Sequence, residues 1–251
     1  MAAGGLDGRI AIVTGASSGI GEATAGALAE QGARVALLAR RADRLQAVAD
    51  AIRARGGSAL ALAVDVTNRA AVTQAVERVV DEWVRVDVLV NNAGIMPLSP
   101  VRSGLVEDWD RMIDVNIKGL LYGIAAVLPH MLEQRRGHIV NVGSVAGRRP
   151  FPGGTVYSAT KYAVRSISAG LRLELSPNDH IRVTDIEPGV VDTELTDHIL
   201  DPAIRDRFST TWAARRPLDA ADVARAIVYV VTQPEHVNVN ELLVRPTEQE
   251  T

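Results

Sequence analysis

The chain has 251 residues, 47% of them hydrophobic, which is enough for one large α/β domain with a sizeable core. A formal charge of −3 leaves no basic excess for a nucleic-acid partner, and a chain with no cysteine and no ligand spacing among its five histidines is not expected to hold a metal. There is no N-terminal signal and no run of about 18 uninterrupted apolar residues, so we expect a soluble cytoplasmic protein that does not bind membranes.

Short apolar runs alternate with segments of helical spacing along the whole chain. The predicted strands are residues 10–14, 35–39, 60–64, 86–91, 138–142, 181–187 and 241–244. The predicted helices are residues 22–31, 41–55, 69–83, 107–133, 157–175 and 220–231. Nearly continuous apolar strands in this alternation are typical of a doubly wound parallel sheet of about seven strands with helices on both faces. No repeat or Pro/Gly-rich linker marks a boundary, so residues 1–251 are expected to form one domain.

One interval interrupts the alternation. Residues 192–217 lie between the sixth strand and the last helix, are more polar than their surroundings and contain no strand run. A long insertion of this kind in a compact fold predicts a small lid or binding loop. The alternative is a surface helix without a role.

The segment TGASSGIG directly follows the first predicted strand and opens the first helix. Gly15, Gly19 and Gly21 allow a tight turn and a close approach to a pyrophosphate, whose charge meets free N–H groups and the helix dipole. Ser17 and Ser18 add hydroxyl donors. The spacing is Gly-x-x-x-Gly-x-Gly and differs from the usual dinucleotide fingerprint. Its position between a strand and a helix nevertheless predicts a dinucleotide site.

The end of the second strand, LLARR, bears on the choice of dinucleotide. An acid near this position binds the ribose hydroxyls of NAD, whereas a cation accommodates the 2′-phosphate of NADP. The position of the acid is occupied by Ala39, and Arg40 and Arg41 follow it. A missing carboxylate beside two guanidiniums predicts NADP(H) over NAD(H). Alternatively, the two arginines are solvent-exposed residues at the start of a helix, although the helix dipole disfavours cations at a helix N-terminus.

A second group of polar residues predicts acid–base chemistry. Tyr157 and Lys161 are four apart in a helical segment and therefore share one face. The reference pKa of tyrosine is about 10, and a nearby cation is expected to lower it. Ser144 follows the fifth strand, at the sheet edge where open α/β folds bind ligands. Taken alone, it would be interpreted as a turn-forming serine. Asn116 is a poor helix former inside a helical stretch, which predicts a partner for its side chain.

The motifs TGASSGIG, NNAG, YSATK and PGVVDT, together with Asn116 and Ser144, resemble the classical short-chain dehydrogenase/reductases in order and spacing over essentially the whole chain. The resemblance implies a single Rossmann-type NAD(P)-binding domain. It also implies that Tyr157 is the general acid/base and that Lys161 lowers its pKa and binds the nicotinamide ribose. By the same resemblance Ser144 orients the carbonyl and Asn116 supports a proton-relaying water chain.

The resemblance also implies further contacts to the cofactor and an assembly. Asn92, Ala93 and Gly94 would contact the adenosine ribose region, Asp65 the adenine, and the segment 188–193 the nicotinamide. The further cofactor-binding residues are Ile20, Asp65, Val66, Asn92, Ala93, Gly94, Val115, Pro188, Gly189, Val191 and Thr193. Members of the family are usually tetramers or dimers built on two long central helices. A homotetramer or dimer through residues 107–133 and 157–175 is therefore expected.

Four less specific sequence segments indicate a subgroup within this family. ARRADRL, NNAGIM, IEPGVVDTEL and VNVNELLVRPTEQ are similar to the NADP-dependent serine and 3-hydroxy acid dehydrogenases and to clavulanic acid dehydrogenase. This implies an NADPH-dependent carbonyl reductase or alcohol dehydrogenase for a small or medium aldehyde, ketone or hydroxy compound, in secondary metabolism. Alternatives are a 3-hydroxy acid or serine dehydrogenase and a 3-oxoacyl-carrier-protein reductase, whose usual C-terminal glycine pair is absent. A dinucleotide-sensing regulator would not need the acid–base residues.

The predicted substrate side is mostly apolar and surrounds Ser144 and Tyr157. Its further members are Ile95, Met96, Val145, Ala146, Gly147, Phe151, Pro152, Leu195 and Trp212. Arg148 and Arg149 follow closely in the chain and would suit an anionic substrate, although solvated loop charges are the alternative.

Overall fold

The computed structural model describes residues 5–206 and 216–249. Its seven strands form one sheet in the order β3-β2-β1-β4-β5-β6-β7, and every neighbouring pair is parallel. The strands are β1 (Ile10–Thr14), β2 (Arg34–Ala39), β3 (Ser58–Ala63), β4 (Val88–Asn91), β5 (Gly137–Val142), β6 (Ile181–Pro188) and β7 (Glu241–Val244). The predicted doubly wound α/β fold is confirmed.

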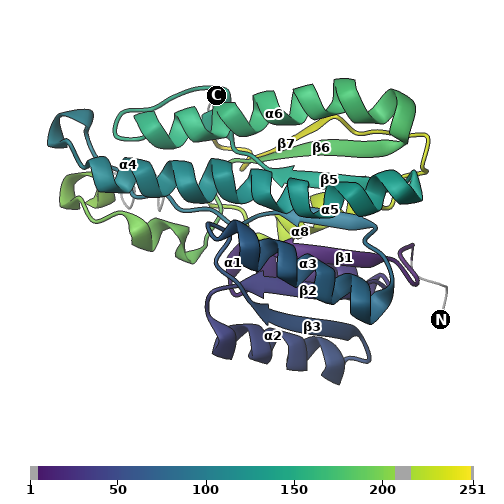
Figure 1. The fold of residues 1–251 in the computed structure, drawn as a ribbon. Helices are drawn as coiled ribbons and strands as arrows, with labels where there is room; N and C mark the ends of the chain where they lie inside the picture. Colours follow the sequence, from purple (N-terminus) through teal and green to yellow (C-terminus); the bar gives the residue numbers. More distant parts are fainter. Residues whose placement is uncertain (1–4, 207–215, 250–251) are drawn as a thin grey trace.

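Helices cover both faces of the sheet (Figure 1). They are α1 (Gly19–Glu30), α2 (Ala42–Ala54), α3 (Arg69–Trp83), α4 (Val106–Ile113), α5 (Leu120–Gln134), α6 (Thr155–Asp179) and α8 (Ala220–Val231). Side chains alternate along each strand, so Ala11 and Val13 of β1 pack with α1, α2 and α8 while Ile10 and Ile12 pack with α3, α5 and α6. Two apolar cores result, one on each face.

The main deviation from the predicted elements lies in the helix expected over 107–133. The structure divides it into α4, a π-helical segment η2 (Asp114–Gly119) and α5. The whole run Val106–Gln134 is long and apolar enough to cross a membrane by composition. Its residues Ile124, Val127 and Met131 are buried in the core beneath α5, which makes it a core helix of this fold.

Two other helices are longer than predicted. The first begins at Gly19 and not at residue 22, because the glycines that mark the turn also form the first helical turn, whose N–H groups need no partner within the helix. The helix α6 extends past the expected end at residue 175 to Asp179 and includes Pro177. Periodicity alone does not locate such ends.

The predicted lid region, residues 192–217, begins with the short 3-10 helix η4 (Glu194–His198), and residues 202–206 are helical. A bridge between Val191 and Leu218 joins the two ends of the segment, and the N–H of Asp192 donates to the Leu218 carbonyl at 2.9 Å. Within residues 192–206 and 216–217 there is no strand, as predicted. This segment follows β6 and so lies at the carboxyl ends of the strands.

Candidate active site

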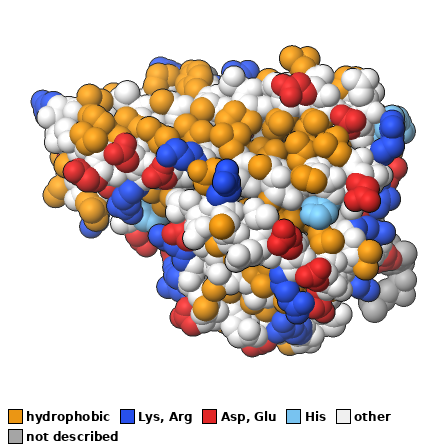
Figure 2. Space-filling view, in the orientation of Figure 1, with side chains coloured by type: hydrophobic (Ala, Val, Ile, Leu, Met, Phe, Trp, Pro, Cys, Tyr) orange, Lys and Arg blue, Asp and Glu red, His pale blue; other side chains and the backbone are white. Residues whose placement is uncertain are grey.

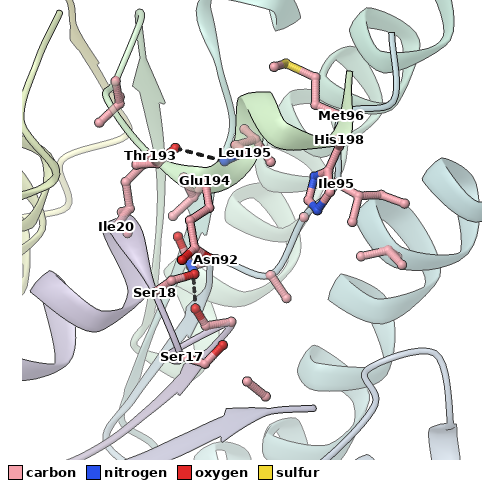
Figure 3. A pocket seen from close by; sticks show the side chains of 18 of the residues that line it. Ser17, Ser18, Ile20, Asn92, Ile95, Met96, Thr193, Glu194, Leu195 and His198 are labelled. Atoms are coloured by element: carbon pink, nitrogen blue, oxygen red, sulfur yellow. Dashed lines mark hydrogen bonds between the residues drawn. The ribbon is translucent and has the colours of Figure 1, made fainter. Parts of the chain in front are cut away.

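A pocket of about 720 Å³ lies at the carboxyl ends of the central strands. Most residues predicted for the cofactor and the substrate line it, and Figure 3 shows part of this wall. These residues are Gly15, Ser17, Ser18, Gly19, Ile20, Arg40, Arg41, Asp65, Val66, Asn92, Ala93, Gly94, Ile95, Met96, Val115, Ser144, Val145, Tyr157, Lys161, Pro188, Gly189, Val191, Thr193 and Leu195. Segments far apart in sequence therefore form one cavity.

The glycine-rich turn packs against the start of the NNAG segment. Gly15 has φ +67°, and a Cβ there would lie 2.8 Å from Asn92 Nδ2 and 2.9 Å from Ala93 Cα. The Asn92 amide donates to the Thr14 carbonyl at 2.9 Å and so holds the two segments together. Gly21 does not face the pocket, contrary to prediction, because it packs behind the turn, where a Cβ would overlap the Gly15 carbonyl oxygen. Both positions therefore require glycine for close packing.

Arg41, just after β2, connects three parts of the pocket rim. Its Nη2 donates to Ser18 Oγ at 2.7 Å, and its Nε and Nη2 donate to Ser17 Oγ at 3.2 and 3.0 Å. Its Nη1 donates to Glu194 Oε2 at 2.8 Å. Arg44, one turn along α2, also donates to Glu194. The guanidinium of Arg41 thus ties the glycine-rich turn to the segment after β6.

Asp65, after β3, is a charged acceptor at the same end of the pocket. Burial raises its pKa, but hydrogen bonds from the backbone and hydroxyl of Thr67, at 2.9 and 2.8 Å, and the nearby Arg40 outweigh that effect and lower the pKa overall. The carboxylate therefore remains ionised beside Arg40.

At the other end of the pocket lie Ser144, Tyr157 and Lys161, all buried. The Tyr157 side chain is hydrogen-bonded to that of Ser144, which follows β5. Lys161 Nζ lies 5.8 Å from the centre of the Tyr157 ring and donates to the Val142 carbonyl at 2.8 Å. Placement one turn apart on α6 puts the phenol and the ammonium on the same wall, next to the end of β5.

The pKa values at this end are governed by burial. Burial raises the pKa of Tyr157 to about 12, and the hydrogen bond with Ser144 offsets only part of this rise. Burial lowers the pKa of Lys161 to about 8, against the opposing effect of the Asp185 carboxylate. The sequence predicted that Lys161 would lower the pKa of Tyr157. The net pKa of Tyr157 is nevertheless raised, because loss of hydration disfavours the phenolate more than its surroundings stabilise it, and the effect of Lys161 on it stays a prediction.

Asn116 has the partner that its position predicted. Its Oδ1 accepts from the Ile95 N–H at 2.9 Å, and its Nδ2 donates to the Ile95 carbonyl at 3.0 Å and to Thr160 Oγ1 at 3.1 Å. A Cβ on Gly94 would lie 3.4 Å from Asn116 Oδ1 and 4.0 Å from Lys161 Nζ. Asn116 and Lys161 therefore approach the same point of the backbone.

This arrangement can be compared with known proteins. A family model described as short chain dehydrogenase matches residues 9–203, well over half of the chain. The chain belongs to the short-chain dehydrogenase family. An uncharacterized oxidoreductase of Staphylococcus saprophyticus is 45% identical over 243 residues, which cover 96% of this chain and 97% of that protein.

Two solved structures of this family carry ligands. The closed form of a serine dehydrogenase complexed with NADP+ has a TM-score of 0.89 and 41% identity and covers 97% of both chains. An alcohol dehydrogenase from the archaeon Thermococcus sibiricus, complexed with 5-hydroxy-NADP, has a TM-score of 0.84 and 29% identity and covers 97% of this chain and 98% of its own. These relatives agree with the NADP(H) predicted from the sequence.

The pocket of this short-chain dehydrogenase has features that fit such a cofactor. Gly15 and Gly19 line the pocket with φ +67° and +56°, a conformation that favours glycine, so no side chain at these positions stands between the backbone and the cavity. The buried end of β2 carries Ala39 where an NAD-selective acid would stand, and the next two residues are arginines on the pocket wall. The donor set suits a dinucleotide with an additional phosphate.

Several substrate-side predictions need correction. Ala146 and Phe151 are not among the residues that line the pocket, although they pack in the same apolar cluster as Tyr157. Pro152 is exposed and does not line the pocket. Arg148 is held by Glu187 and Glu241, so its guanidinium serves an ion-pair cluster and not a substrate anion. Gly147 packs against the Lys161 backbone, 2.8 Å from an added Cβ, and Trp212 lies outside the described residues.

Other residues of this short-chain dehydrogenase site were missed. Glu194 and Arg44 line the pocket, as does His198, whose pKa is lowered by burial and by Arg111, Arg40 and Arg41. Asp185, on β6, is completely buried and acts electrostatically on Lys161. A carboxylate in the buried strand IRVTDIE is a signal that sequence reasoning could have used, because such groups are almost never buried without a partner.

Proposed function

We propose that this short-chain dehydrogenase is an NADPH-dependent carbonyl reductase and alcohol dehydrogenase. It transfers hydride between NADP(H) and the CH–OH or carbonyl carbon of a small or medium aldehyde, ketone or hydroxy compound. The observation that carries this proposal is the buried set of Tyr157, Ser144 and Lys161 on the wall of a pocket whose opposite end suits a phosphorylated dinucleotide.

NADPH, when bound, supplies the hydride. Tyr157 donates the proton to the carbonyl oxygen, and its pKa of about 12 keeps it protonated at neutral pH. Ser144, hydrogen-bonded to Tyr157, lies where it can bind the same oxygen. Lys161, with a pKa of about 8, is mainly an ammonium at neutral pH and stabilises the phenolate that forms on Tyr157. Asn116 positions the backbone at Ile95, beside these groups.

Two observations support NADP(H). Arg40 and Arg41 follow the position at which an acid would select NAD, and solved relatives are complexes with NADP+ and 5-hydroxy-NADP. Arg41 also bonds both serines of the glycine-rich turn. A guanidinium fixed in this way is pre-organised to receive a phosphate.

The substrate side supports a compact, largely apolar substrate. Ile95, Met96, Val145 and Leu195 line the pocket beside Tyr157. The second candidate is a serine or 3-hydroxy acid dehydrogenase, favoured by the serine dehydrogenase with a TM-score of 0.89. The two candidates share the same acid–base group and differ only in the polarity of the substrate.

The test follows NADPH oxidation by absorbance against a panel of aldehydes, ketones and oxo acids, with NADP reduction by serine and 3-hydroxy acids as the reverse arm. Tyr157→Phe is expected to lower kcat by about 10²–10⁴, because only the proton donor is lost. Its NADPH affinity, measured by fluorescence titration, should stay within about twofold of wild type.

Each arm of this experiment can contradict the proposal. NADPH binding without turnover of any carbonyl or alcohol would favour the dinucleotide-sensing regulator. Loss of NADPH binding in Tyr157→Phe, with an unchanged melting temperature, would mean that the phenol serves to bind the cofactor and not to donate a proton.

We also propose that residues 1–251 act as one domain, that the enzyme works in the cytoplasm and that it assembles as a homotetramer or dimer through α4–α5 and α6. The exposed apolar side chains on these helices support the assembly.

A further inference from the structure

Glu194 lies at the start of η4, directly after Thr193, and reaches across the mouth of the pocket. Its Oε2 accepts from Arg41 Nη1 at 2.8 Å, and its Oε1 accepts from Arg44. Figure 3 shows its side chain descending from the loop after β6 toward Ser18 and Asn92. One carboxylate therefore joins Arg41, just after β2, and Arg44, on α2, to the opposite rim of the pocket.

The guanidinium of Arg41 has few donors left. It has five N–H groups in a fixed fork. The Nε and Nη2 groups bond to Ser17 and Ser18, and Nη1 bonds to Glu194. Four of the five N–H groups are therefore engaged, and a phosphate that binds Arg41 through two N–H groups must replace one of these partners. The carboxylate is the partner whose charge has the same sign as that of the phosphate, and leaving it in place would set two anions side by side.

We infer that Glu194 is a specificity-determining residue that competes with the 2′-phosphate of NADP(H) for Arg41 and Arg44. NADP(H) displaces the carboxylate and releases η4 from the arginines, whereas NAD(H), which lacks the 2′-phosphate, leaves the ion pairs in place. This inference rests on the proposed use of NADP(H). Glu194 thereby weakens the binding of NADP(H). It also reduces the preference for NADP(H) over NAD(H) that Arg41 and Arg44 create.

The size of the effect follows from exposure. The side chains of Arg41, Arg44 and Glu194 are 41%, 47% and 45% exposed, so water and salt screen the ion pairs. Loss of Glu194 is therefore expected to lower the NADPH dissociation constant by about three- to tenfold. The hydrogen bonds from Arg41 and Arg44 lower the pKa of Glu194 to about 2, so the carboxylate is ionised throughout the neutral range.

A different role would give the opposite sign. If Glu194 stayed on the arginines as a clamp that closes over the bound cofactor, its removal would weaken the binding of NADPH and NADH alike. Competition, in contrast, predicts tighter binding of NADPH alone. The two roles are therefore separated by the direction of the change and by its dependence on the 2′-phosphate.

The experiment measures the dissociation constants of NADPH and NADH by fluorescence titration for wild type and Glu194→Gln. NADPH should bind about three- to tenfold more tightly to the variant, and NADH should change by less than about twofold. Asp43→Asn is the matched control: it removes an equal charge beside Arg44, from an exposed residue outside the pocket lining. It should leave both constants unchanged. At high salt the difference between wild type and Glu194→Gln should shrink.

A dissociation constant for NADPH that is unchanged or larger in Glu194→Gln overturns the inference. A rise in the dissociation constants of both NADPH and NADH would mean that Glu194 acts as a clamp over the cofactor. These outcomes leave the proposed function intact if wild type still prefers NADPH. A wild-type protein that binds NADH as tightly as NADPH overturns both the proposed cofactor and the competition. An equally large tightening of NADPH binding in Asp43→Asn would mean that any lost negative charge has this effect, which also overturns the inference.

Discussion

Asp185 is a buried carboxyl group that acts electrostatically on Lys161, a member of the proposed acid–base group. It is completely buried on β6, and neither carboxylate oxygen has a hydrogen-bond partner among the described residues. It packs against Gly143, where a Cβ would overlap the carboxylate, next to the Val142 carbonyl that binds Lys161. Burial, Glu187 and Glu241 raise its pKa to about 7, while Lys161 and Arg172 oppose the rise. Asp185 therefore acts as a positioning charge for Lys161.

We predict that Asp185→Asn shifts the pH profile of carbonyl reduction. The Asp185 charge raises the pKa of Lys161, which burial alone would take lower than about 8. Without that charge the ammonium loses its proton at a lower pH. The basic limb of kcat/KM for reduction, measured with saturating NADPH, should therefore move down by about 1 pH unit. Glu174→Gln, at an exposed position of the same helix as Lys161, should leave the profile unchanged. Superimposable profiles of Asp185→Asn and wild type would contradict the assignment.

The residues that sequence reasoning found and those that it missed differ in how they are specified. Tyr157 and Lys161 are four apart on one helix, so their proximity follows from local geometry. Glu194 meets Arg41 across 153 positions of the chain, and no local pattern encodes that contact. The raised pKa of Tyr157 was missed for the same reason, because burial depends on packing from several elements.

At the scale of elements, the π-helical segment η2 sets the position of Asn116. The sequence predicted the strands within two residues and the order of the helices correctly, since apolar periodicity specifies which faces are buried. A π turn inserts one residue into this periodicity and leaves little trace in it. The only sign in the sequence was an asparagine in a helical stretch. In the structure its amide satisfies both backbone groups of Ile95, on the segment after β4.

We predict that Asn116→Ala destabilises the fold. Its side chain is 3% exposed, and its removal leaves the N–H and carbonyl of Ile95 without their partner. Each unsatisfied buried group costs about 1–3 kcal/mol, so the free energy of unfolding in urea should fall by about 2–4 kcal/mol. Lys118→Ala is the control in the same segment, since it breaks only an exposed ion pair with Asp114 and should cost under about 1 kcal/mol. Equal losses in the two variants would mean that Asn116 does not anchor the segment.

At the scale of the whole molecule, an apolar band covers the outer face of the helices α4, α5 and α6. Figure 2 shows hydrophobic side chains gathered across this face, in the orientation of Figure 1. Ile113, Leu121 and Leu132 are 38%, 40% and 39% exposed along α4 and α5, and Tyr162 and Leu173 are 41% and 80% exposed along α6. Contiguous exposed apolar surface on a globular protein marks an interaction site. It supports association of two copies through these helices.

We predict that Leu121→Arg weakens this association. In a pair of copies joined through α5 and α6 the arginine would be buried at an apolar contact without a partner, which costs several kcal/mol. In the single chain the position is 40% exposed, so the fold should tolerate the change. Sedimentation velocity should show the wild type as a dimer or tetramer and the variant shifted toward a smaller species, with a similar melting temperature. Val84→Arg, at an 83% exposed residue that ends α3 away from the band, controls for added charge. An unshifted assembly in Leu121→Arg would place the interface elsewhere, and a monomeric wild type would leave the band without a second copy to cover it.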